Sequence, residues 1–87
     1  KLFSTTSIKR IGRNRFLRNV LIAIGNSGDD NFINDITPLL LDNSHLVRAM
    51  AVWSLSQLCN KKKFEKLKKS YLHLESDIGV IKEWHFT

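Results

Sequence analysis

The chain has 87 residues, of which 43% are hydrophobic and 25% charged, and its formal net charge at pH 7 is +6. A chain of this length makes one small domain, with too much apolar content for intrinsic disorder and too little volume for a deep active-site cavity. Its single cysteine, Cys59, excludes an internal disulfide or a cluster of metal-binding thiolates, and it favours a reducing, cytoplasmic setting. No apolar run approaches the ~20 residues that span a bilayer. The first residue is Lys1 rather than methionine, so we expect a piece of a longer protein.

Residues 1–12 show no sustained hydrophobic period and are expected to form a lead-in or linker from a preceding domain. A helix is predicted over 13–25, because apolar residues recur there at helical spacing. They are Phe16, Leu17, Val20, Leu21 and Ile24, which predict a helix buried on most of its circumference. Gly25 and Gly28 favour a helix end, since glycine readily adopts the left-handed conformation of a C-cap.

A second helix is predicted over 30–41, after the capping residue Asp29. Pro38 interrupts it by removing one backbone N–H and crowding the preceding turn. One kinked helix is the favoured interpretation. The alternative is that Thr37 caps a new short turn with Pro38 in its first position.

Three further helices are predicted over 45–59, 61–74 and 78–86, the first after the N-cap Ser44 and the others after Asn60 and Asp77. The third was expected to bury Leu46, Val47, Met50, Ala51, Leu55 and Leu58 on one broad face, and the last to carry Ile78, Val80, Ile81 and Trp84.

The chain contains a weak internal repeat. Gly25 aligns with Ser56, and Ile36 with Leu67, at a common offset of 31 residues. Helix pairs that repeat at this length are typical of α-solenoids, in which each unit buries its apolar face against its neighbours. We therefore predict an all-α fold, a short HEAT-like solenoid of about five helices, with residues 13–87 as the repeat domain.

Basic residues form two clusters that are separated by an acidic segment. Such clusters can neutralise phosphates, and arginine can hold a phosphate through two hydrogen bonds. The candidate nucleic-acid contacts are Lys9, Arg10, Arg13, Arg15, Arg18, Lys61, Lys62 and Lys63. The alternative interpretation is a solvated surface that keeps the domain in solution.

Other chemistry has little support in the sequence. The three histidines are too scattered for a metal site, and neither Ser27 nor Cys59 has an evident base. Asp42, in a turn between helices, and Arg48, on the next helix, form a pattern with which helical repeats tie one unit to another. Their predicted role, like that of Gly25 and Gly28, is structural, and no residue is assigned to catalysis or to a metal.

Two segments carry a family resemblance. The first runs Ile-Lys-Arg-Ile-Gly-Arg over 8–13 and then Arg-Asn-Val-Leu-Ile-Ala-Ile-Gly-Asn-Ser-Gly over 18–28; the second includes Leu46-Val47-Arg48 and Ala-Val-Trp-Ser-Leu over 51–55. Together they resemble the C-terminal domain of bacterial epoxyqueuosine reductase, from about Ser7 to Leu58.

The resemblance implies a specific function. Enzymes of that family reduce epoxyqueuosine to queuosine in tRNA, the final step of queuosine biosynthesis, using a cobalamin-binding domain and a ferredoxin-like domain with two 4Fe–4S clusters. By resemblance, this chain is the HEAT-like part, which helps to bind tRNA and contacts the upstream catalytic and ferredoxin-like domains of the same chain. The cofactors and the catalytic residues then lie outside this chain, which holds no matching cysteines.

Two other hypotheses remain open. The domain could be a protein-interaction scaffold with no nucleic-acid role, or its arginines could face the preceding domain.

Overall fold

The computed structural model of this chain describes residues 10–86, with side chains from Gly12 onward. These residues form α-helices and short 3-10 helices, and no strand lies within this range, so the predicted all-α class is confirmed. The elements are α1 (Arg10–Ser27), η1 (Asp30–Phe32), α2 (Ile33–Ile36), η2 (Thr37–Leu41), α3 (His45–Leu58), α4 (Lys61–Tyr71), η3 (Leu72–Leu74) and α5 (Ile78–Phe86).

The first helix is longer at both ends than predicted. It begins at Arg10, so the last three residues of the predicted lead-in are helical, and it continues past Gly25 to Ser27. Gly28 has φ of 70°, which confirms the left-handed position predicted for it. The helix continues through Gly25, whose φ is not positive, and stops at Gly28.

The second segment is not the single kinked helix that we favoured. Residues 30–41 pass from the 3-10 turn η1 through one turn of α-helix, α2, into the 3-10 helix η2. Pro38 lies in the first turn of η2, where its missing N–H costs no helical hydrogen bond. The alternative was closer, although Thr37 is the first residue of η2 and donates its hydroxyl to the Ile33 carbonyl at 2.8 Å.

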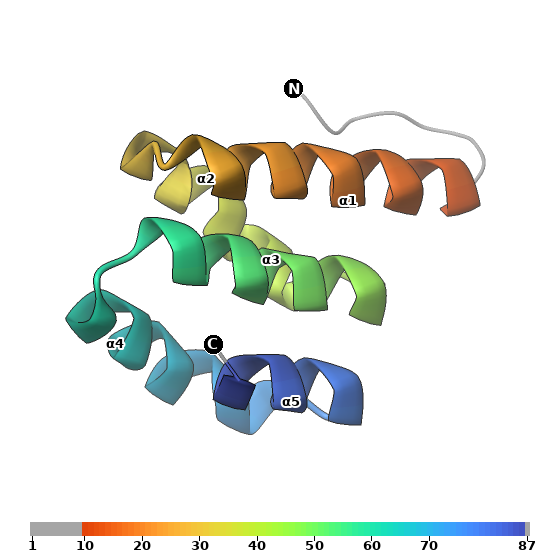
Figure 1. The fold of residues 1–87 in the computed structure, drawn as a ribbon. Helices are drawn as coiled ribbons and strands as arrows, with labels where there is room; N and C mark the ends of the chain where they lie inside the picture. Colours follow the sequence, from red (N-terminus) through yellow and green to blue (C-terminus); the bar gives the residue numbers. More distant parts are fainter. Residues whose placement is uncertain (1–9, 87) are drawn as a thin grey trace.

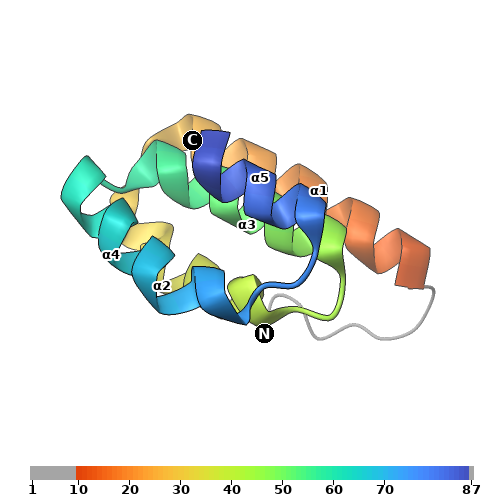
Figure 2. The ribbon, with the colours of Figure 1, turned by 90° about the horizontal axis from the view of Figure 1, so that it is seen from below.

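The helices form two layers with α3 at the centre. Figure 1 shows α1, α3 and α5 side by side and running in the same direction. Helix α3 packs against α1 on one side and α5 on the other, and it also contacts α2, η2 and α4. The view from below places α2 and α4 in a second layer (Figure 2). Leu17 and Leu21 of α1 are fully buried.

Two residues that were predicted to be buried, Phe16 and Leu46, are instead 51% and 57% exposed, and Ile78, which the last predicted helix carries, is 66% exposed. Next to Phe16 and Leu46, the apolar residues Leu17 and Val47 are fully buried. Phe16 lies on α1 and Ile78 on α5, the two helices at the edges of the layer, and an edge helix buries a narrower stripe because it has a neighbour on one side only; Leu46 lies in the first turn of the central helix α3. Trp84 of α5 is 1% exposed and packs against Phe64 of α4, with 5.2 Å between the two ring centroids.

The turn between helices occurs twice, but at an offset that differs from the one predicted from the sequence. The turn after η2 recurs after η3 at an offset of 33 residues, from Asp42 to Glu75 and from Ser44 to Asp77. The offset of 31 inferred from the sequence holds between the ends of α1 and α3, at Ser27 and Leu58, whereas Arg13 and Arg48, each the fourth residue of its helix, are 35 residues apart. Between the fourth residue of the first helix and the carboxylate of the turn, the second unit is two residues shorter than the first, 27 against 29, because α3 has 14 residues and α1 has 18.

Candidate functional site

The first inter-helix turn fixes the start of α3 through backbone hydrogen bonds. The Asp42 N–H donates to the Leu39 carbonyl at 3.1 Å, and the Asp42 carboxylate accepts from the Ser44 N–H at 3.0 Å. Ser44 in turn caps the helix, because its hydroxyl accepts from the Val47 N–H. One carboxylate therefore shapes the turn and orients the cap.

The second turn repeats these contacts with different residues. The Glu75 N–H donates to the Leu72 carbonyl at 3.0 Å, and the Glu75 carboxylate accepts from the Asp77 N–H at 3.0 Å. Asp77 caps α5 by accepting from the Val80 N–H at 3.1 Å. The two turns are therefore structurally equivalent.

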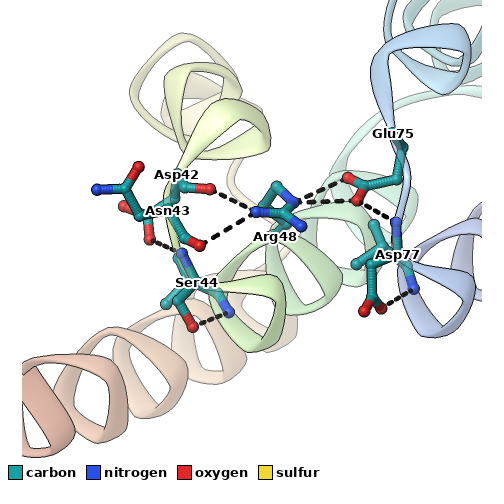
Figure 3. A network of polar contacts seen from close by, with 8 residues as sticks. Asp42, Asn43, Ser44, Arg48, Glu75 and Asp77 are labelled. Carbon is teal, nitrogen blue, oxygen red and sulfur yellow. Dashed lines mark hydrogen bonds and ion pairs between the residues drawn. The ribbon is translucent and has the colours of Figure 1, made fainter.

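An arginine from the preceding helix binds each of these carboxylates. Arg13 of α1 donates to the Asp42 carboxylate at 2.6 and 3.3 Å, and Arg48 of α3 donates from Nε to the Glu75 carboxylate at 2.9 and 3.2 Å. Both arginines are the fourth residue of their helix. Arg48 also donates from Nη1 to the carbonyls of Asp42 and Asn43, at 2.7 and 3.3 Å, and so joins the two turns (Figure 3).

The structure changes how Asp42 and Arg48 are paired. Both residues tie helices together, but the Asp42 side chain binds Arg13, and Arg48 reaches only the Asp42 backbone. The carboxylate partner of Arg48 is Glu75, which the sequence did not single out. Glu75 lies 33 residues after Asp42, whereas the repeat inferred from the sequence has an offset of 31, so the repeat did not indicate Glu75.

The ion pair with Asp42 is partly screened from solvent. Burial raises the pKa of the Asp42 carboxyl, but the hydrogen bond from Arg13, the Ser44 N–H and the charges of Arg13 and Arg48 outweigh it and hold that pKa below its usual value. The hydrogen bond to Asp42 likewise raises the pKa of Arg13. Arg13, predicted as a nucleic-acid contact, is therefore also a structural residue.

The other predicted basic contacts fall into two groups. Arg15 and Arg18 are exposed on α1. Lys61, Lys62 and Lys63 are exposed in the first turn of α4. Lys9 lies outside the described residues, as does the side chain of Arg10.

Two further exposed lysines, Lys66 and Lys69, lie beside the second group and were not among the predicted contacts. Lys66 and Lys69 follow Lys62 at intervals of four and three residues, so they share one side of α4. Together with Lys61, Lys62 and Glu65 they surround a shallow surface hollow. The helical spacing of these lysines was the signal that could have found them.

Gly25 has a role that its position at the predicted helix end did not suggest. A Cβ atom at this position would lie 2.5 Å from the ring of Trp53 and 3.2 Å from the Ser54 hydroxyl. The buried Ser54 hydroxyl donates to the Leu21 carbonyl at 2.9 Å. Helices α1 and α3 can therefore approach closely here, because Gly25 has no side chain and the buried Ser54 hydroxyl has a hydrogen-bond acceptor in the Leu21 carbonyl.

No cofactor chemistry is evident within residues 10–86. No group of three His, Cys, Asp or Glu side chains that could hold a metal ion occurs in that range. Cys59 is half-buried, and burial raises the pKa of its thiol, which lowers its nucleophilicity at neutral pH. In the same part of the chain, no helix is long and apolar enough to cross a membrane.

Comparison with known proteins found no family model, curated protein or solved structure that matches this chain.

Proposed function

We propose that this domain binds RNA through its phosphate backbone. The observation that carries the proposal is the group of exposed lysines on α4, where five lysines share the exposed surface with one acidic residue, Glu65. Arg15 and Arg18 add exposed positive charge on α1. Phosphate binding by such residues releases counterions, so the affinity depends strongly on salt and little on sequence.

The resemblance supports a more specific form of this proposal. We propose that the chain is a non-catalytic HEAT-like domain of an epoxyqueuosine reductase, that its RNA is tRNA, and that cobalamin and two 4Fe–4S clusters belong to upstream domains in the cytoplasm. The segments from Ser7 to Leu58 support this assignment, as does the repeated arginine–carboxylate turn, since linked helical units are what a HEAT-like solenoid requires. Residues 60–87 contribute nothing to the resemblance.

Fluorescence anisotropy with labelled tRNA tests RNA binding. The logarithm of the association constant should fall linearly with the logarithm of salt concentration, with a slope of about −0.9 for each phosphate neutralised in a duplex. An Arg15→Gln, Arg18→Gln variant should bind more weakly while retaining the wild-type circular dichroism spectrum.

Arg13→Gln is the informative comparison in this experiment. Arg13 holds Asp42, so its replacement should lower the melting temperature, whereas the exposed pair should not. Absence of salt-dependent tRNA binding by the wild-type domain would overturn the RNA proposal.

A second candidate function is a protein-interaction scaffold. Four large apolar side chains are more than half exposed near the two equivalent turns: Leu41, Leu46, Leu74 and Ile78. Leu41 and Leu74 also line a hollow of about 190 Å³ beside Arg48. Recovery of a protein partner from nuclease-treated lysate, lost in a Leu41→Ser, Leu74→Ser variant, together with no RNA binding, would favour this function.

A further inference from the structure

Helix α4 has two sides of opposite character. Its inner side carries Phe64, which is 5% exposed, and the half-buried Leu67 and Tyr71. Its outer side carries Lys62, Lys66 and Lys69, which follow each other at intervals of four and three residues. These three lysines span about 10 Å along the helix axis, at 1.5 Å per residue. We call them the outer lysines.

The charges at the start of this helix oppose its stability, whereas Lys68 and Lys69 in the last turn favour it. Lys61, Lys62 and Lys63 occupy the first turn, where the positive end of the helix dipole favours acidic residues, and that turn contains none. Lys62 and Lys66 are also like charges at a spacing of four residues, which destabilises a helix. The cap is the neutral Asn60, whose side chain accepts from the Lys63 N–H at 2.8 Å. A polyanion bound along this side would relieve all of these repulsions, and so the charge pattern is complementary to one.

The exposed positions of α4 carry no side chain on which an unpaired base would stack. Its exposed positions hold lysines, Glu65 and Ser70, and no aromatic or arginine side chain. Of the two aromatic rings of α4, Phe64 packs on Trp84 inside the core and Tyr71 is half-buried on the inner side. Proteins that bind single strands combine a basic groove with aromatic side chains on which unpaired bases stack. The outer side of α4 lacks the second component.

We propose that the outer lysines form a binding surface for base-paired nucleic acid, and that it prefers a duplex to a single strand. A surface that gains its binding energy from phosphates alone favours the polymer with the higher density of charge. A duplex carries about one charge per 1.7 Å of axis, roughly twice the density of one strand, and releases more counterions for each phosphate neutralised. This inference rests on the proposed RNA-binding function and specifies the form of RNA.

The test compares an RNA duplex of about 12 base pairs, long enough to cover the α4 surface, with one of its strands alone, by anisotropy at several salt concentrations. The wild-type domain should bind the duplex more tightly. Replacement of the three outer lysines by glutamine should flatten the salt slope for the duplex by about 2 to 3.

A matched pair of single variants locates the surface. Lys66→Gln on α4 should reduce the slope by about 1, while Lys82→Gln, which removes the same charge from an exposed position on α5, should leave it unchanged. Equal effects of the two variants, equal affinity for duplex and single strand, or tighter binding to phosphatidylserine vesicles than to the duplex would each overturn the inference. If the wild-type domain binds neither RNA, the proposed function fails with it.

Discussion

Arg48 should be the residue whose loss most damages the linkage between the two repeated turns. Replacement by Met keeps the unbranched apolar part of the side chain and removes four hydrogen bonds, two to the Glu75 carboxylate and two to the carbonyls of Asp42 and Asn43. The Glu75 side chain is 6% exposed, so its charge would remain screened from water with only the Asp77 N–H as a partner.

The magnitude follows from that arrangement. Removing one member of a buried ion pair costs about 3–5 kcal/mol, and one net hydrogen bond to a charged group contributes about 1.5–3 kcal/mol. Because Glu75 lies at a turn that can relax toward solvent, we expect a loss of about 2–4 kcal/mol in the free energy of unfolding. A small domain of this size loses about 4–8 °C in melting temperature for each kcal/mol.

Urea denaturation followed by circular dichroism measures this loss, with Arg18→Met as the control because Arg18 is exposed on α1. A double-mutant cycle with Glu75→Gln separates the ion pair from the loss of side-chain packing, and we expect a coupling energy above about 1 kcal/mol. If Arg48→Met costs no more than Arg18→Met, or if the coupling energy is near zero, the network does not link the turns as described.

Two other predictions concern the contacts around α1. Gly25→Ala should lower the free energy of unfolding by about 1 kcal/mol, because crowding against the Trp53 ring and the Ser54 hydroxyl outweighs the helix propensity gained from alanine; an unchanged or higher urea midpoint would contradict this packing. The stabilisation from the Asp42–Arg13 pair should be fully present above the unfolded pKa of aspartate, about 3.9, and should be lost as pH falls through the lower folded pKa. Urea midpoints between neutral pH and pH 2 should therefore fall more steeply for the wild type than for Asp42→Asn, and parallel curves would argue against the pair.

The sequence by itself determined where the helices lie. Hydrophobic periodicity and capping residues placed the segments 45–59, 61–74 and 78–86 within a residue or two of the observed elements. These signals are local, because a cap or a helical stripe is satisfied by residues within a few positions along the chain. The left-handed Gly28 is local in the same sense, since only its own backbone conformation requires glycine.

The tertiary structure alone decided which residues meet across the helices. Arg13 and Asp42 are 29 positions apart, and Arg48 and Glu75 are 27 apart, so no local pattern joins them. The sequence placed Gly25 at a helix end and did not indicate its contact with Trp53, because that contact depends on how closely α1 approaches α3. The sequence placed Phe16 in the core, but it is exposed, because its burial depends on which side of α1 has a neighbour. Side-chain pairing, close approach of helices and burial depend on two elements packed together, so the sequence of one segment does not determine them.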